Sequence, residues 1–320
     1  MYRLPMLFPG QASQAVGMAG DLAGGDGPGA RFLADVDGIL EHPLTGLMYE
    51  GPAETLTETW NAQPAILAHS VAVALELRER GIVPGAAAGH SLGEFSAAVA
   101  LGSLEPADGL RLVRRRGELM FAAGTSRPGA MAAVMGLSAA AVSEVCARVS
   151  ETDGVVVLAN HNSSTQIAIS GEVPAVEAAC EALKSAGAKR AIRLNVSGAF
   201  HSPLLDEAAA DFATHLEDVS VADPSAPLVA NVSAEPVRDG AGLKEGFRRQ
   251  LTSPVLWHDS LAVVAAGGAT GEVPRVVLEV GPGKVLSNLA RREYPDITFL
   301  PVGTSSDLDT VLDRLGELLA

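Results

Sequence analysis

A serine framed by two glycines is the first place in this sequence where chemistry can be expected. The stretch "GHSLGEF" at residues 89–95 contains the pattern Gly89-x-Ser91-x-Gly93. A serine in this pattern can stand on a sharp strand-to-helix turn and attack a carbonyl carbon. The pattern alone is weak evidence, because a chain with 34 glycines matches it easily. A small serine that only caps a helix would give the same pattern.

A serine nucleophile needs a base, and the chain offers seven histidines. His90 is adjacent to Ser91, but neighbours on a sharp turn point in different directions. His201 stands in "SGAFHSPLL", in a loop that enters a new helix, with the apolar Phe200 and Pro203 close to it. These surroundings favour His201 as the base. A histidine that only makes a hydrogen bond at a helix start remains the alternative.

Three consecutive arginines offer a site for a negatively charged group. In the helix predicted around them, at about 100° per residue, Arg116 lies at the edge of the apolar stripe. Arg114 and Arg115 point toward solvent. A buried guanidinium is costly unless it is paired, and its planar fork suits a carboxylate. Arg116 is therefore predicted to bind a carboxylate ligand, the alternative being a structural pair with Glu94 or Glu118.

The elements around these residues alternate between strands and helices. Apolar runs that stop at glycines or turns predict buried strands at 2–11, 85–93 and 275–283. Helical spacing of apolar residues predicts helices at 59–81, 94–104 and 107–124. This alternation predicts a mostly parallel sheet that is covered on both faces. Ser91 would then stand between a buried strand and a helix, as a nucleophile on a sharp turn requires.

A different order of elements begins near residue 128. Residues 129–196 predict strand, helix, strand, strand, helix and strand, with Ser138 capping the first helix. This is the ferredoxin-like β-α-β-β-α-β arrangement. We therefore expect a small domain at 128–197, inserted into a large α/β domain formed by 1–127 and 198–320.

Composition and charge exclude several functional classes. Hydrophobic residues make up 48% of the 320, charged residues 19%, and the net charge is −15. This is the composition of a globular protein with no general affinity for nucleic acid. No apolar run reaches the length of a membrane span, and the first residues lack the features of a signal peptide. Cys146 and Cys180 lie far apart without clustered histidines, so we expect reduced thiols, no metal site and a cytoplasmic location.

Six motifs occur in one order along the chain: "FPGQASQ" (8–14), "GHSLGE" (89–94), "RRGELM" (115–120), "GAFHSPLL" (198–205), "RQLTSPVLW" (249–257) and "EVGPGKVL" (279–286). Together they resemble the malonyl-CoA:acyl-carrier-protein transacylases and the acyltransferase domains of polyketide synthases. The resemblance runs from about residue 5 to residue 300. It implies an α/β-hydrolase-like core with an inserted ferredoxin-like subdomain, in agreement with the elements read from the sequence.

The resemblance also implies roles for individual residues. Ser91 matches the acylated nucleophile and His201 its general base. The family has no third, acidic member of this pair, and the backbone carbonyl of Gln250 would orient the histidine instead. Arg116 matches the arginine that binds the free carboxylate of the malonyl group. Phe200, just before the base, is expected to fill the space that an α-methyl group would need, which favours malonyl over methylmalonyl.

The resemblance assigns the oxyanion hole to two backbone N–H groups, those of Gln11 and Leu92. At one position near this site the sequence departs from the family pattern. The family's usual "GQGSQ" is "GQASQ" here, with Ala12 in place of a glycine. A methyl group at this position can shift the backbone that carries Gln11.

The implied reaction moves a malonyl group from CoA to the phosphopantetheine thiol of an acyl carrier protein, with no further cofactor. The expected partners are malonyl-CoA and the carrier protein, and the expected state is a monomer. One alternative is a trans-acting acyl hydrolase that clears acyl chains from carrier proteins; in such relatives the carboxylate-binding arginine is typically replaced, so Arg116 argues against it. The other is a non-catalytic module that binds carrier proteins.

Overall fold

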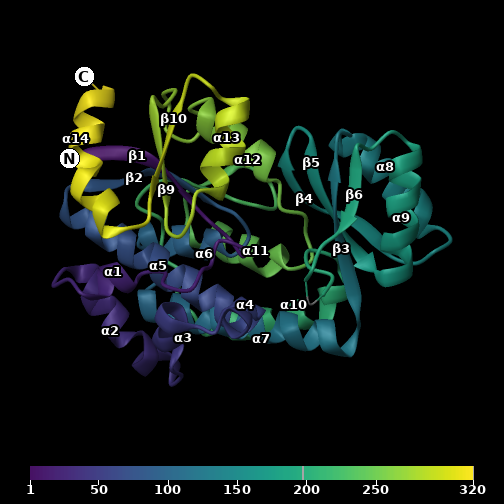
Figure 1. Cartoon of the computed structure of the whole chain (residues 1–320), viewed down its shortest axis with the longest axis horizontal. Coiled ribbons are helices and arrows are strands. Elements are labelled where there is room, and N and C mark those ends of the chain that lie inside the picture. The colour runs from purple at the N-terminus through teal and green to yellow at the C-terminus, as the bar shows by residue number, and fades with distance from the viewer. Residues whose placement is uncertain (197, 320) are drawn as a thin grey trace.

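Two sheets lie side by side in the computed structural model, which describes residues 1–196 and 198–319 (Figure 1). The larger sheet of the described chain has the strand order β10-β9-β1-β2-β7-β8. Its strands are β1 (Tyr2–Phe8), β2 (Ile82–Gly89), β7 (Leu228–Val229), β8 (Pro236–Val237), β9 (Val276–Val280) and β10 (Thr298–Val302). Neighbouring strands run parallel except β7 and β8. The prediction of an α/β fold with a mostly parallel sheet is confirmed.

Helices cover both faces of this sheet because successive strand residues point to opposite sides. Met6 belongs to the core that the sheet shares with α2, α5, α7 and α10, whereas Leu7 packs with α12 and α13. The helices of this part are α1 (Gly20–Ala23), α2 (Pro28–Leu40), α3 (Leu44–Glu50), α4 (Ala53–Thr57), α5 (Thr59–Glu79), α6 (Gly93–Ala100), α7 (Pro106–Ser126), the short 3₁₀ helix η1 (Pro203–Leu205), α10 (Asp206–Glu217), α11 (Gly240–Gln250), α12 (Trp257–Ala265), α13 (Val285–Glu293) and α14 (Ser305–Leu319). Among the described residues, no helix is both long and apolar enough to cross a membrane.

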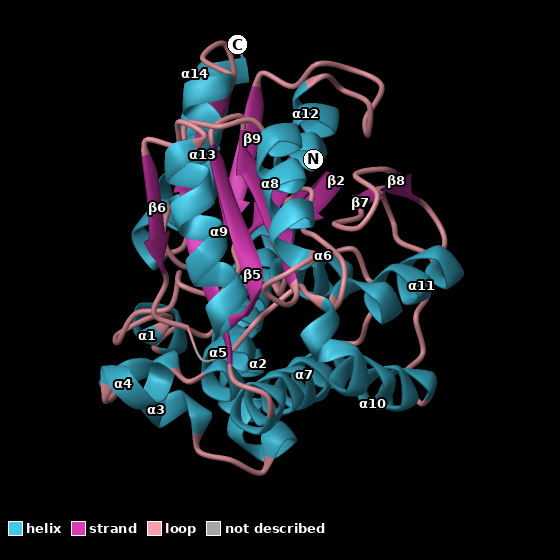
Figure 2. Ribbon diagram, turned by 90° about the vertical axis from the view of Figure 1, so that its right-hand side faces the viewer, coloured by secondary structure: helices cyan, strands magenta, loops and turns pink. Residues whose placement is uncertain are grey.

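The smaller sheet is antiparallel and has the order β4-β5-β3-β6. Its elements follow the predicted order: β3 (Gly129–Met135), α8 (Ala139–Ser150), β4 (Val156–Ser163), β5 (Gln166–Glu172), α9 (Val173–Ser185) and β6 (Arg190–Arg193). Figure 2 shows α8 and α9 lying over this sheet, with which they share a separate apolar core. The Ser138 side chain caps α8 by accepting a hydrogen bond from Ala141 N–H, as expected.

The chain enters the smaller sheet directly after α7, and after β6 it continues through η1 and α10 to β7 of the larger sheet. The exact bounds of an inserted domain at 128–197 stay a prediction, and residues 197 and 320 lie outside the described residues. The two parts are joined at the outer edge of β4. There Val255 N–H donates to Ala159 O, and His161 N–H donates to Val255 O, both at 2.9 Å.

Candidate active site

Ser91 stands on a sharp turn between β2 and α6, which we call the elbow (residues 89–93). Its backbone has a φ of 50°, a left-handed conformation that is uncommon for a residue other than glycine. The flanking glycines are needed because the chain crosses itself closely. A Cβ at Gly89 would lie 1.9 Å from the carbonyl carbon of Gly93, and one at Gly93 would lie 2.0 Å from Phe8 O. The turn carries Ser91 out of the sheet and places it before the N-terminus of α6.

His201 meets Ser91 across 110 residues of chain. Its Nε2 lies 2.8 Å from Ser91 Oγ, and its Nδ1 lies 2.9 Å from the carbonyl oxygen of Gln250. Since a carbonyl can only accept, Nδ1 carries the proton and Nε2 is free to accept one from the serine. Burial, together with the charge of Arg116, lowers the pKa of His201 to about 3. The imidazole is therefore neutral at pH 7, as a base must be.

Arg116 is fully buried in α7, with 1% of its surface exposed. Its Nη1 donates to Gln63 Oε1 at 2.8 Å, and its Nη2 donates to Gln250 Oε1 at 2.9 Å and to Ser91 Oγ at 3.1 Å. Burial lowers the pKa of Arg116 to about 10, so it keeps its charge at pH 7. A group attached to Ser91 would therefore meet a buried cation with a planar pair of donors.

The neighbouring arginines do not both follow the prediction. Arg115 is 40% exposed, whereas the side chain of Arg114 is only 16% exposed. Arg114 pairs with Glu118 at 2.8 Å and lies over the Trp60 ring. The prediction that Arg114 points to solvent is wrong, because α5 packs along α7 and covers it. Glu118, one of the two acids considered as a structural partner for Arg116, is engaged by Arg114 and Arg115 instead.

Glu94 is a buried acid behind the elbow. It accepts a hydrogen bond from Asn231 N–H at 3.0 Å and another from the side-chain amide of Gln250. Burial raises the pKa of Glu94 to about 7, although these hydrogen bonds and the charge of Arg116 oppose the shift. Glu94 acts on Arg116 through its charge.

Gln250 connects these groups at the end of α11. Its backbone carbonyl accepts from His201, its side-chain oxygen accepts from Arg116, and its side-chain nitrogen donates to Ser91 O at 2.9 Å. One residue thus touches the candidate base, the candidate carboxylate site and the elbow.

Leu92 belongs to the elbow, and Gln11 stands in a loop that lies against it. A Cβ at Gly10 would stand 2.4 Å from His90 O, so the loop after β1 lies directly against the elbow. Gln11 follows in that loop, and its side chain donates to Thr59 Oγ1 at 3.1 Å. Leu92 is the residue before α6, where backbone N–H groups carry partial positive charge. Ala12 has a φ of 80°, where a glycine would be unstrained.

Phe200 is buried beside the base. It belongs to the main apolar core of the larger part of the molecule. A Cβ at Gly198 would lie 3.3 Å from its ring, so little space is left on that side. The backbone of His201 has a φ of 57°, which turns the imidazole from this core toward Ser91.

Three further residues of the site were not singled out from the sequence: Gln63, Asn162 and Asn231. Gln63 binds Arg116, and Asn162 Oδ1 lies 2.8 Å from His90 Nε2. Asn231 holds the elbow through hydrogen bonds to Ser91 and Gly89. A signal was present for two of them, since Gln63 directly precedes the apolar run "PAILA" of α5 and Asn231 directly follows the apolar run "PLVA".

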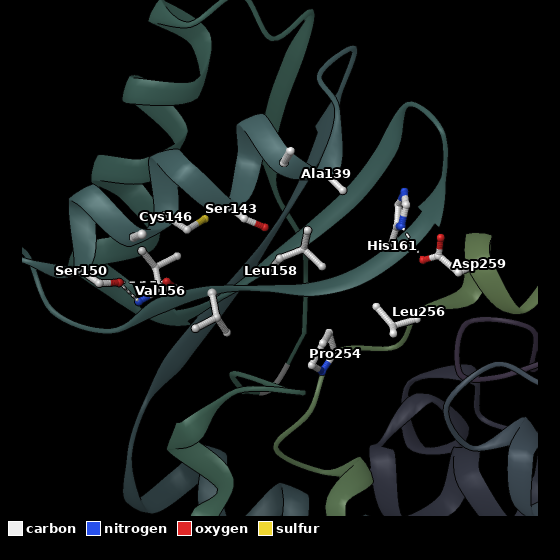
Figure 3. A pocket seen from close by; sticks show the side chains of 13 residues that line it. Ala139, Ser143, Cys146, Ser150, Val156, Leu158, His161, Pro254, Leu256 and Asp259 are labelled. Carbon is white, nitrogen blue, oxygen red and sulfur yellow. Dashed lines mark hydrogen bonds and ion pairs between the residues drawn. The ribbon is translucent and has the colours of Figure 1, made fainter. Parts of the chain in front are cut away.

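A separate groove of about 750 Å³ lies between α8, β4 and the segment around Pro254. Figure 3 shows His161 and Asp259 pointing toward each other near one end, and their side chains are 3.0 Å apart. None of the predicted site residues lines this groove. Burial raises the pKa of Cys146, which does line it, to about 12, so the thiol is protonated at pH 7. The part of this groove that Cys146 lines therefore offers no thiolate nucleophile.

Comparisons with known proteins show which family this chain resembles. The model of the family "Acyl transferase domain" matches residues 6–300. The malonyl CoA-acyl carrier protein transacylase of Bacillus subtilis (strain 168) is 41% identical over 317 residues, which cover 99% of this chain and 98% of the relative.

Solved structures show the same likeness. The acyl-carrier-protein-S-malonyltransferase of Bartonella henselae is 40% identical with a TM-score of 0.90, and the match covers 99% of this chain and 100% of that one. A malonyl-transacylase solved in complex with its type II PKS acyl-carrier protein is 36% identical with a TM-score of 0.90, covering 98% and 99%.

Proposed function

The chain belongs to the acyl transferase domain family, and we propose that it transfers malonyl groups from CoA to an acyl carrier protein through an ester on Ser91. One observation carries the proposal. The buried guanidinium of Arg116 donates to the same Ser91 Oγ that faces the neutral His201 imidazole. A nucleophile beside a fixed cation suits an acyl group with a free carboxylate, as in malonyl.

In the first half of the reaction Ser91 is acylated. His201 Nε2 takes the proton of Ser91 Oγ as the oxygen attacks the thioester carbonyl carbon. The carbonyl oxygen becomes an oxyanion, which the N–H groups of Gln11 and Leu92 would stabilise. The carbon–sulfur bond then breaks, and the imidazolium gives its proton to the CoA thiolate. Arg116 would hold the malonyl carboxylate throughout.

The second half reverses the roles. The thiol of the carrier protein's phosphopantetheine loses its proton to His201 and attacks the ester carbon on Ser91. The bond to Ser91 Oγ breaks and the serine recovers its proton from the imidazolium. Both halves exchange a thioester for an ester or the reverse, so we propose that no cofactor is required. That the enzyme is a monomer located in the cytoplasm stays a prediction, as does the absence of nucleic-acid and membrane partners.

The intact mass of the protein after mixing with acyl-CoAs tests this function. We expect a stable malonyl adduct, a smaller amount of methylmalonyl adduct because of Phe200, and little acetyl adduct. A single methyl group in a pocket is worth about 1–3 kcal/mol, so the preference over methylmalonyl should be partial. Adding a phosphopantetheinylated carrier protein should remove the adduct and produce malonyl-carrier protein.

The same experiment separates the alternatives. An adduct that disappears in water as fast with carrier protein as without it, giving free malonate, would identify a hydrolase. A protein that binds the carrier but forms no adduct with any acyl-CoA would be a binding module.

A pH profile tests the state of the base. Because burial and the Arg116 charge lower the pKa of His201 to about 3, the neutral form persists well below pH 6. We expect the acylation rate of the free enzyme to show no fall from histidine titration between pH 8 and pH 5. Rapid-quench measurement of kcat/KM for malonyl-CoA would show this.

Glu94 is a second group that could change the acylation rate within this pH range, since burial raises its pKa to about 7. If a limb near pH 7 appears, the Glu94→Gln variant assigns it. Loss of the limb in this variant attributes it to Glu94, and a limb that persists there contradicts a neutral His201.

A further inference from the structure

Asn231 makes a bridge across the elbow from a position that directly follows β7 and Ala230. Its Oδ1 accepts a hydrogen bond from Ser91 N–H at 2.7 Å, and its Nδ2 donates to Gly89 O at 2.6 Å. Its own N–H donates to Glu94 Oε1, and its carbonyl accepts from Leu256 N–H at 2.9 Å. The residue is completely buried, and its side-chain amide uses one acceptor and one donor on the two backbone groups that flank His90, the N–H of Ser91 and the carbonyl of Gly89.

The amide continues the sheet beyond the point where regular pairing stops. β7 pairs with β2 through Leu228 with Ala87 and Val229 with Ala88. After these pairs β2 turns into the elbow. There the carbonyl of Gly89 and the N–H of Ser91 form hydrogen bonds with a side chain instead of with a neighbouring strand. Asn231 supplies both partners, because only an amide of this length carries a donor and an acceptor side by side.

The geometry points to Asn231 as a positioning residue that holds Ser91 in its reactive backbone conformation. A non-glycine residue in the left-handed region is strained and persists only where its surroundings fix it. The hydrogen bond to Ser91 N–H fixes that conformation directly. It also occupies the N–H of Ser91 itself, which leaves the next N–H, that of Leu92, for the oxyanion.

This inference rests on the proposed acylation of Ser91, and the experiment keeps the two apart. Acylation of the wild-type protein by malonyl-CoA is measured first, and its absence would count against the proposed function alone. In Asn231→Ala we expect the acylation rate at saturation to fall on the order of 10²-fold, the loss typical of a small misplacement of reacting groups, with KM changed less than about threefold. A folded Asn231→Ala protein with the wild-type rate would overturn the inference.

Asn231→Asp provides a readout that loss of stability alone would not give. Its carboxylate can still accept from Ser91 N–H but presents a second acceptor to Gly89 O, so acylation should be slow at pH 8. A protonated carboxyl restores the donor and the acceptor, and burial favours that form. We therefore expect the acylation rate of this variant to rise as pH falls from 8 to 5, while its circular dichroism stays constant.

Asn61 offers a matched control. It is also buried, and it also uses both ends of its amide, donating to Thr55 O and accepting from Arg114. Asn61→Asp should show no gain in acylation rate at low pH. If Asn231→Ala does not fold, Asn231→Asp decides: a rate that is flat or falls toward pH 5 in the folded variant contradicts the positioning role.

Discussion

Ser91→Ala is expected to leave the protein with no covalent malonyl adduct and to lower malonyl transfer by at least about 10⁴-fold, as loss of a catalytic serine does elsewhere. The reason is that Ser91 Oγ is the oxygen that faces both His201 Nε2 and the Arg116 guanidinium. The fold should be retained, because alanine fits the same turn and the hydroxyl is not part of the core. Intact-mass measurement after mixing with malonyl-CoA would give the result directly.

Ser260→Ala is a suitable control for this experiment. Ser260 is buried as well, and its hydroxyl donates to Leu256 O at the N-cap of its own helix. This variant should be acylated like the wild type. Stoichiometric acylation of Ser91→Ala would show that another residue is the nucleophile.

Arg116→Ala is expected to have the second largest effect, and to act selectively. Removing one partner of a buried, hydrogen-bonded charge pair costs about 2–5 kcal/mol, so kcat/KM for malonyl-CoA should fall roughly 30- to 4,000-fold. Acetyl-CoA has no free carboxylate and should lose much less. The ratio of the two kcat/KM values is therefore the measurement, and it should drop toward one.

Two further variants sharpen this test. Arg116→Lys should restore little, since an ammonium group cannot reproduce the planar fork that reaches Gln63, Gln250 and Ser91 together. Arg115→Ala, one position earlier and 40% exposed, should keep the wild-type ratio. If Arg116→Ala keeps its preference for malonyl, Arg116 does not bind the carboxylate, and the acyl-hydrolase alternative gains.

The fold could be predicted from local patterns because it is built from strongly periodic segments. The apolar runs that stop at glycines became β1, β2 and β9, and the β-α-β-β-α-β order appeared between Gly129 and Arg193. Burial of Arg116 also followed from helical geometry alone. The same geometry wrongly predicted that Arg114 faces solvent. The angle of a residue around its own helix carries no information about neighbouring helices, and Trp60 of α5 covers Arg114.

The site was less accessible from the sequence, because its contacts join distant parts of the chain. The resemblance pointed to Ser91, His201, Gln250 and Arg116, and the structure brings these four together; their roles stay predictions. Asn231 lies 140 positions from Ser91 and Gln63 lies 53 positions from Arg116. A single buried amide has no pattern of its own, so only the packing of α5, α7 and the end of β7 around the elbow identifies these partners.

The left-handed conformations of Ser91 and His201 carry a consequence for how this protein can evolve. The proposed nucleophile and the proposed base both occupy backbone positions that glycine would fill without strain. A substitution to glycine at either position would relieve the backbone strain, but it would also remove the Ser91 hydroxyl or the His201 imidazole. Stability and activity are therefore opposed at these two positions. A more thermostable descendant of this chain has to gain its stability elsewhere, for instance at Ala12, where a glycine would relieve a similar backbone without removing a reacting group.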